Sequence, residues 1–355
     1  PTPPKPSLPP PLILLAIAST TTYYYLTPSP PATLNTETFT PYTITARTPI
    51  SPTSFILTTV SNNPSSPSTY LSSSRWRFPL WSVEFKQPEV QIARHYTPLP
   101  GGNPNELRFY IRTLNRGEMS AYLNRLREGS ELFLRGPHPG FEVESRLGSQ
   151  QQVVFLAGGT GVVPGLQVAR AVLDREDTRF TLLWAVRKRE EVQSVTPKKS
   201  WWQTLWGGIR EVEVIECPSP IGKEIQALKT QYGDRFKIHV AVDEEKTAFT
   251  SREVQSTLGS TPHTDENKAC QLHNQKQHAV LSEFEEERKS CVCDQSTPRG
   301  KNLFFVSGPE GFVSHFAGAK TWLNGMEAQG PVGGILGRLQ HGNSSFARDW
   351  LVLKL

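Results

Sequence analysis

The run from residue 153 to residue 166 constrains the fold of this chain more than any other stretch. An apolar, β-branched segment at residues 153–157 breaks into Gly158-Gly159-Thr160-Gly161, and an amphipathic segment follows. This order predicts a buried parallel strand, a tight glycine turn and the start of a helix, where free backbone N–H groups can bind a phosphate group. The same order of segments is equally compatible with a glycine turn that binds no nucleotide. The sequence also departs from the dinucleotide fingerprint, because Pro164 and Gly165 stand where that fingerprint has its third glycine.

Two shorter motifs lie upstream of this turn. Arg94-His95-Tyr96-Thr97-Pro98 ends an alternating run at residues 90–97, which predicts a strand. Gly117-Glu118-Met119-Ser120 precedes a predicted helix at residues 121–126, with Gly129 at the expected C-terminal cap. Ser120, near the helix start, can offer its hydroxyl and nearby backbone N–H groups to a pyrophosphate. Each motif alone is compatible with a surface arginine or a plain helix cap, but their order and spacing favour a cofactor site.

With these motifs the chain resembles the ferredoxin-reductase-type flavoproteins, and within them NADH–cytochrome b5 reductase. The resemblance runs from Thr43 to around Leu323. The segments that carry it are Arg94-x-Tyr96-Thr97-Pro98, residues 107–112, Gly117-x-Met119-Ser120, residues 132–137, residues 157–164 and residues 304–312. The resemblance implies an α+β fold of two domains, an antiparallel six-stranded Greek-key FAD-binding β-barrel followed by a Rossmann-like α/β domain for the nicotinamide nucleotide. It also implies FAD as the cofactor and NADH or NADPH as the electron donor.

The resemblance further implies site residues. Arg94 would contact the flavin pyrophosphate, Tyr96 would pack along the isoalloxazine ring and Thr97 would face its N5 region. Thr97 and Ser307 are expected at the catalytic centre, whereas strand alternation points the His95 side chain away from the flavin. The expected cofactor-binding residues are Arg94, His95, Tyr96, Thr97, Tyr110, Ile111, Arg112, Gly117, Glu118, Met119, Ser120, Gly158, Gly159, Thr160, Gly161, Pro164, Arg187, Ser307, Gly308 and Pro309.

Three positions depart from the family pattern. Ser307 replaces a cysteine, so hydride transfer is expected to be slower, and Val163 replaces a threonine near the flavin. A flavin-binding assembly factor with weak or lost activity therefore stays open beside an active oxidoreductase. Arg187 stands about where the family has a neutral amide, and a cation there can contact the 2′-phosphate of NADPH. Because a solvated loop explains Arg187 equally well, NADH and NADPH both remain candidates.

Hydrophobic patterns divide the chain into an anchor and two domains. Alternating runs at residues 42–46, 54–60, 81–85 and 90–97 predict barrel strands, and a polar stretch at 61–74 predicts a flexible insertion. From residue 152, strands at 153–157, 180–186 and 236–242 alternate with helices, which predicts a parallel sheet. The predicted boundaries are an anchor and linker at 1–38, an FAD domain at 39–148, and a NAD(P) domain at 149–355 with a disordered insertion at about 244–301.

The first residues predict attachment to a membrane. Residues 11–27 carry no charge and include three consecutive tyrosines, which is typical of a short spanning helix, although a leftover signal segment and a proline-rich tail stay open. This segment, Ser307 and the tail at residues 349–355 together resemble fungal mitochondrial flavoproteins that assist haem attachment to cytochrome c. That likeness implies a mitochondrial inner-membrane protein whose body faces the intermembrane space. It also implies a haem protein or a haem-attachment lyase as the electron acceptor.

Composition disfavours two other function classes. The formal net charge of +5 permits an anionic partner, but no dense cluster of lysine and arginine interleaved with aromatic residues predicts nucleic-acid binding. Cys270, Cys291 and Cys293 lie near histidines in the predicted insertion, yet Cys291-Val292-Cys293 lacks the two-residue gap of zinc motifs. We therefore expect no nucleic-acid partner and no metal ligands.

Overall fold

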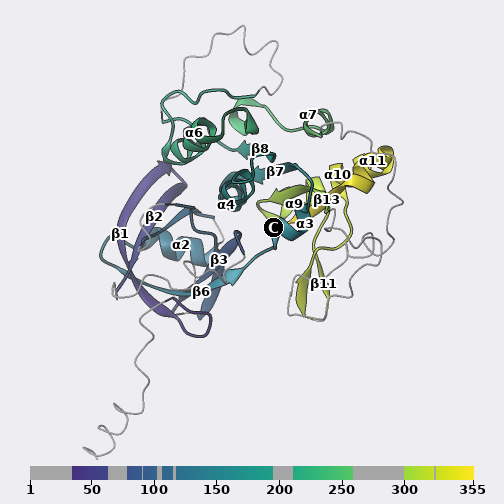
Figure 1. The fold of residues 1–355 in the computed structure, drawn as a ribbon. Coiled ribbons are helices and arrows are strands. Elements are labelled where there is room, and N and C mark those ends of the chain that lie inside the picture. The colour runs from purple at the N-terminus through teal and green to yellow at the C-terminus, as the bar shows by residue number, and fades with distance from the viewer. Residues whose placement is uncertain are drawn as a thin grey trace, which may run out of the picture.

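The computed structural model describes residues 34–62, 78–89, 91–101, 106–114, 117–194, 211–258, 300–323 and 325–355. The predicted membrane anchor and the stretch at 63–77 lie outside these residues. Within them, no helix is long and apolar enough to cross a membrane. Figure 1 shows two bodies of structure, a β-rich first part and a sheet flanked by helices.

The first part is a six-stranded antiparallel barrel sheet with the strand order β4-β3-β6-β1-β2-β5. Its side chains alternate between a buried and a more exposed face, and the buried face encloses an apolar core around Phe85, Phe109 and Leu132. One helix, α2 (Glu118–Arg125), lies next to β4 and adds Met119 and Leu123 to that core. The strands are β1 (Thr40–Ser51), β2 (Ser54–Ser61), β3 (Trp81–Gln87), β4 (Ile92–Tyr96), β5 (Glu106–Arg112) and β6 (Glu131–Pro139).

The second part is a five-stranded parallel sheet with the order β13-β10-β7-β8-β9. Successive residues of its central strand are buried on opposite faces, which explains the continuous apolar run at 153–157. The strands are β7 (Gln152–Gly158), β8 (Arg179–Val186), β9 (Phe236–Val242), β10 (Asn302–Ser307) and β13 (Trp350–Lys354).

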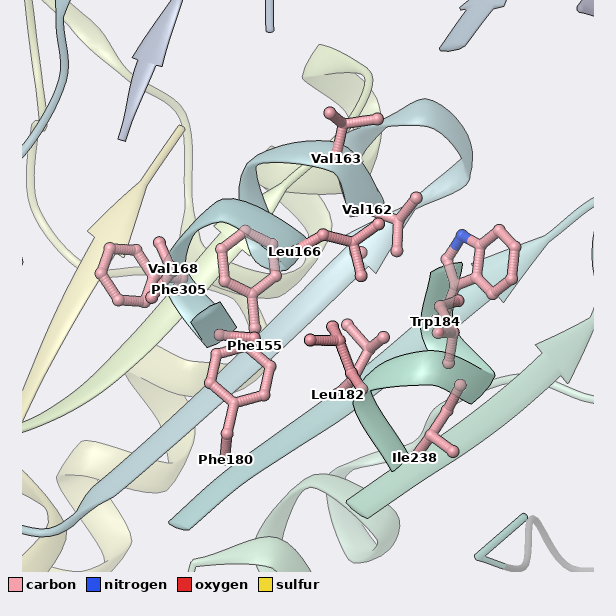
Figure 2. Packing of buried hydrophobic residues seen from close by; sticks show 14 of the residues in the cluster. Phe155, Val162, Val163, Leu166, Val168, Phe180, Leu182, Trp184, Ile238 and Phe305 are labelled. Atoms are coloured by element: carbon pink, nitrogen blue, oxygen red, sulfur yellow. The ribbon is translucent and has the colours of Figure 1, made fainter. Parts of the chain in front are cut away.

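Helices cover both faces of this sheet. On one face, α4 (Val162–Leu173) and α6 (Pro220–Tyr232) pack on Phe155, Leu182 and Ile238, which come from three adjacent strands (Figure 2). The other face is covered by α7 (Ser251–Thr257), α9 (Glu310–Ala317), α10 (Gly334–Gly342) and α11 (Ser344–Asp349). The remaining elements are α3 (Val143–Leu147), the short 3₁₀ turns η1 (Gly159–Gly161), η2 (Arg189–Glu191), η3 (Gly233–Arg235) and η4 (Asp243–Glu245), and a hairpin of β11 (Thr321–Leu323) and β12 (Met326–Ala328).

Several predicted boundaries were wrong. β4 begins at Ile92, because Gln91 adopts a left-handed conformation with φ of 54° that interrupts an extended strand. The helix predicted at 121–126 begins at Glu118 and ends before Leu126, so Gly129 is not its cap; it has φ of 84° in the turn before β6.

The insertion predicted at 244–301 also begins too early. Residues 244–258 form η4 and α7, and Phe249 and Val254 are buried against the parallel sheet. Polar composition hid this segment, because only these few of its side chains enter the core. Residues 259–299 lie outside the described part of the chain.

Candidate functional site

The glycine turn joins β7 to α4 and lies directly against the end of β10. A Cβ atom on Gly161 would lie 2.5 Å from the carbonyl oxygen of Ser307, and one on Gly158 would lie 2.9 Å from the Phe312 ring. Gly159 has φ of 56°, a conformation that favours glycine. The structure therefore brings together the predicted residues 158–161 and 307–308. The chain's own packing explains these glycines, so their presence alone does not require a nucleotide.

The helix after the turn starts without strain. Pro164 occupies the first turn of α4, where a missing N–H group breaks no helical hydrogen bond. Val163 lies in the first turn of α4, on the side away from the strands of the sheet (Figure 2), and its side chain is buried in the apolar cluster. Thr160, in the turn itself, is partly exposed.

Tyr110 and Arg112 contact a residue that the sequence analysis missed. The Tyr110 hydroxyl donates to Glu191 Oε2 at 2.7 Å, and Arg112 Nη2 forms an ion pair with the same oxygen atom. Burial and the Glu191 carboxylate raise the pKa of the Tyr110 hydroxyl far above its usual value. Both residues were expected to bind cofactor, whereas the structure shows them holding a carboxylate of the second part of the chain. A glutamate in a charged loop carries no pattern that predicts this contact.

Arg112 also lies over the glycine turn. Its Nη1 atom is 3.1 Å from the position that a Cβ atom on Gly159 would occupy. The neighbouring Ile111 side chain is buried in the core of the barrel sheet. Of the expected residues on β5, Arg112 therefore reaches the turn, and the Ile111 side chain does not.

The Arg94 motif occupies the end of β4. Tyr96 stacks on Phe85, with ring centroids 4.6 Å apart, and burial raises the pKa of Tyr96 to about 12. Arg94 is exposed, and its Nη1 donates to the carbonyl oxygen of Ala93 at 2.9 Å. Thr97 follows the strand and is partly exposed. An exposed cation and a tyrosine ring therefore occupy alternate positions of one strand, beside α2.

Ser120 has a different hydroxyl environment from the one predicted. It is the third residue of α2, is buried, and donates to the Gly117 carbonyl oxygen at 3.0 Å while it accepts from the Leu114 N–H at 3.0 Å. Its hydroxyl therefore shapes the turn before the helix. Met119 packs in the barrel core, and Glu118 is exposed in the first helical turn.

The His95 side chain lies in a polar cluster on the barrel. Its Nδ1 atom is 3.1 Å from Ser82 Oγ, and its ring packs edge-on against His138. Glu84 joins the cluster through Arg135, whose Nε donates to Glu84 Oε2 at 2.6 Å. Desolvation by burial lowers the pKa of His95. His95 was among the expected cofactor-binding residues, but its side chain is committed to these partners.

The remaining predicted residues line the carboxyl ends of the parallel strands. Ser307 is the last residue of β10 and is buried, Gly308 has φ of 155°, and exposed Pro309 precedes α9. Arg187 follows β8 and is exposed. Among the described residues, no group of three or more His, Cys, Asp and Glu side chains is arranged to hold a metal ion.

The side chains at the end of β4 suit a dinucleotide that carries a planar ring. Arg94 is a bidentate donor open to solvent, the Tyr96 ring offers an apolar surface, and α2 starts beside them. The guanidinium and the helix start provide donors for a pyrophosphate, and the tyrosine ring provides a surface for a flavin ring.

Comparison with known proteins shows which family part of this region resembles. Residues 80–143 match the sequence family of the oxidoreductase FAD-binding domain. This stretch is therefore similar to an oxidoreductase FAD-binding domain. The matched stretch of this domain contains Arg94, Tyr96, Thr97 and Ser120, together with strands β3 to β6.

Relatives extend the likeness beyond the FAD-binding domain. An uncharacterized FAD-binding protein of Schizosaccharomyces pombe is 32% identical over 142 residues, which cover 40% of this chain and 50% of that protein. The cytochrome c mitochondrial import factor of Saccharomyces cerevisiae is 24% identical over 73% of this chain and 69% of its own length. NADH-cytochrome b5 reductase 2 of Neosartorya fischeri is 24% identical over 71% of this chain and 60% of its own length. The chain thus spans half of the first of these relatives and 60% of the reductase.

A solved structure has the same fold as both the barrel and the parallel sheet of this chain. The cytochrome b5 reductase domain of Ulva prolifera nitrate reductase superposes with a TM-score of 0.53 at 14% identity. The match covers 92% of this chain and 100% of that chain. The predicted barrel followed by a parallel α/β sheet is therefore confirmed.

Proposed function

We propose that this protein is an FAD flavoprotein oxidoreductase that carries electrons from NADH or NADPH to a haem-iron acceptor. In the balanced reaction, one nicotinamide nucleotide gives up a hydride, two ferric haems each gain one electron, and one proton is released. FAD, when bound, supplies both the acceptance of the hydride and the release of single electrons. The protein's part is to hold the two nucleotides and the acceptor in place.

One observation carries this proposal. The FAD-binding domain contributes Arg112 to the glycine turn of the parallel sheet, and the same turn packs on Ser307. A nucleotide bound at the turn would therefore lie at the boundary of the two parts, next to a flavin held at the end of β4. Arg94 and the start of α2 would hold the flavin pyrophosphate, and Tyr96 would pack along the ring. Residues 158–161 and Arg187 would face the nicotinamide nucleotide.

Ser307 would act at the reactive end of the nicotinamide. A serine oxygen is smaller and less polarisable than the cysteine sulfur of the family pattern. The nicotinamide would therefore be held less firmly over the flavin, and a misplacement of about an ångström can reduce the rate by on the order of a hundredfold. We propose slow transfer rather than loss of transfer.

The acceptor and the location are proposed from relatives. One relative is named for cytochrome c import into mitochondria and another for cytochrome b5 reduction, and both names point to a haem protein. We propose a mitochondrial inner-membrane protein, held by residues 11–27, with its body in the intermembrane space. Its domains would span residues 39–148 and 149–355, with the insertion narrowed to 259–299.

Two alternatives stay in view. As an NADH–cytochrome b5 reductase, this chain would use the same site residues and would differ only in its electron acceptor. A flavin-binding assembly factor with weak or lost activity is favoured by Ser307 and Val163, which depart from the reductase pattern.

Anaerobic stopped-flow absorbance separates these functions. The purified chain should be yellow from non-covalent FAD, NADH or NADPH should bleach it slowly, and Ser307→Cys should bleach faster. Ferric cytochrome c or cytochrome b5 should then restore the yellow colour, and the faster of the two identifies the acceptor class. Flavin that neither nucleotide bleaches, even in Ser307→Cys, favours the assembly factor. A wild-type chain that stays colourless with excess FAD overturns the proposal.

A further inference from the structure

Glu191 is a buried carboxylate that joins the two parts of the molecule. It ends η2, just after β8, and its side chain is 1% exposed. Its backbone carbonyl oxygen accepts from Ser219 Oγ at 2.6 Å, which fixes it to the start of α6. Its side chain reaches the other way, to the Tyr110 hydroxyl and the Arg112 guanidinium of β5.

The position of Arg112 depends on this carboxylate. The Arg112 side chain is 10% exposed, and neither its buried Nε atom nor its buried Nη2 atom has a hydrogen-bond partner among the described residues, so Nη2 is compensated by charge alone. The ion pair with Glu191 therefore supplies the compensation that a buried guanidinium needs. The same guanidinium lies over Gly159, with Nη1 3.1 Å from the site of a Cβ atom there.

The contact continues into the parallel sheet. Trp184 of β8 donates from its indole Nε1 to the Gly159 carbonyl oxygen at 2.9 Å, so Gly159 lies next to both the Trp184 indole and the Arg112 guanidinium. Trp184 is fully buried in the core beneath α4 (Figure 2). Its indole N–H is therefore a reporter of where the turn lies.

We infer that Glu191 is a positioning residue, which holds Arg112 over the glycine turn and thereby fixes that turn for an anionic nucleotide. This inference rests on the proposed function, because the nucleotide in question is the nicotinamide donor. Glu191 pairs with Nη2 of Arg112 and acts on the nucleotide through the guanidinium.

Glu191→Gln in the full, FAD-loaded chain tests this role. The amide keeps a hydrogen-bonding group for Tyr110 but removes the charge that compensates Arg112. We expect the KM for the better nicotinamide donor to rise by about tenfold or more, as for a displaced positioning group. We also expect the indole N–H resonance of Trp184, assigned with Trp184→Phe, to shift. Bound FAD should stay the same, because Arg94 and Tyr96 are untouched.

Glu245→Gln is the matched control. Glu245 pairs with Arg189 of the same η2 turn, through Arg189 Nε at 2.9 Å and Nη2 at 2.6 Å, but this pair makes no part of the contact with β5 or Gly159. The control should leave both the KM and the Trp184 resonance unchanged. Equal effects of the two substitutions would show general loosening of η2 and would overturn the inference.

Further variants keep the test decisive. If Glu191→Gln does not fold, Glu191→Asp retains the charge but shortens the side chain, and it should still shift the Trp184 resonance.

The double variant Glu191→Gln/Arg112→Gln removes both charges of the ion pair. It should recover the melting temperature that Glu191→Gln loses, without recovering the KM. An unchanged Trp184 resonance in Glu191→Gln rejects the role of Glu191. If the wild type shows no flavin reduction, the proposed function is rejected instead. The Trp184 indole resonance then still tests whether Glu191 positions the glycine turn.

Discussion

Gln167 of α4 donates from its side-chain Nε2 to the carbonyl oxygen of Pro98, at 2.9 Å. The same amide accepts at Oε1 from the Trp81 backbone N–H at 3.0 Å. The helix that follows the glycine turn is thereby fastened to the residue that closes the Arg94 motif. One buried glutamine therefore ties the two predicted cofactor motifs together.

Gln167→Leu should destabilise the protein. Leucine fills much of the same space but has no polar atoms, so it leaves the Pro98 carbonyl and the Trp81 N–H buried without these partners, and each such group costs about 1–3 kcal/mol. We expect a lower urea midpoint with an unchanged m-value. Gln255→Leu, at an exposed position of α7, is the control and should leave the midpoint nearly unchanged. Equal midpoints for Gln167→Leu and wild type would contradict this account of the contact.

Gly161→Ala should disturb the contact between the glycine turn and β10. The new Cβ atom would lie 2.5 Å from the Ser307 carbonyl oxygen, so the turn must move. A forced fit of this kind typically costs about 1–3 kcal/mol, which a thermal melt would detect. Gly311→Ala adds the same methyl group in α9, where nothing lies within 4 Å, and should be neutral or slightly stabilising. A neutral Gly161→Ala would show that the turn is looser than it appears here.

Arg94→Ala should weaken FAD binding. Loss of a charged hydrogen-bond donor to a phosphate typically costs about 1.5–3 kcal/mol, which corresponds to roughly tenfold or more in Kd. Flavin retained after gel filtration, quantified by absorbance, measures this loss. Arg179→Ala, at the exposed start of β8, removes the same side chain away from the motif and should retain flavin. Full retention in Arg94→Ala would remove Arg94 from the flavin site.

Lys354 should make stability depend on pH. Its ammonium group is buried and donates to the carbonyl oxygens of Ala319 and Pro331 at 2.9 and 2.8 Å, and burial lowers the pKa of Lys354 to about 8. The unfolded chain, with an ordinary lysine pKa near 10.5, then binds more protons between these two values. Stability should therefore rise as the pH increases from about 8 toward 10.5.

Urea unfolding at pH 7.5 and pH 9.5 checks this sign. The wild type should gain stability relative to Lys354→Met at the higher pH. Lys223→Met, on the exposed side of α6, controls for loss of a positive charge. A constant difference between wild type and Lys354→Met at both pH values would refute the prediction.

Two deletions should separate the corrected insertion boundary from the predicted one. Replacing residues 259–299 with a short Gly/Ser linker should preserve folding and flavin binding, because long surface connections are tolerated. Replacing residues 245–299 should lower the melting temperature, since it removes buried Phe249 and Val254 and the Glu245–Arg189 ion pair. Equal melting temperatures would restore the earlier boundary.

Sequence patterns predicted the architecture well because they report burial. The run at 153–157 is apolar on every residue since β7 has neighbours on both faces, and the barrel strands alternate since only one face is enclosed. The left-handed conformation of Gln91 was not predicted, because a single residue leaves no periodic signal in the sequence. The burial of Phe249 and Val254 was not predicted either, because two apolar side chains in a polar segment form no periodic pattern.

The sequence predicted the motifs of the site but not the side-chain contacts that join them. Glu191 and Gln167 contact residues that are 81 and 69 positions away in the sequence, Tyr110 and Pro98. No local spacing rule covers such contacts. Resemblance supplied roles for Tyr110 and Ser120 in cofactor binding, while the structure shows both hydroxyl groups engaged within the protein.

The strand order of the barrel limits how this protein can be dissected. β1 and β2 lie in the middle of that sheet, between β6 and β5, although they precede the matched residues 80–143 in the sequence. A fragment cut at residues 80 and 143 would lose two internal strands, which separates β5 from β6 and exposes unpaired ladder edges that promote aggregation. A unit proposed to bind flavin would therefore have to begin before Thr40, and chimaeras that exchange only residues 80–143 between relatives would transplant β3 to β6 without the two strands that join β6 to β5.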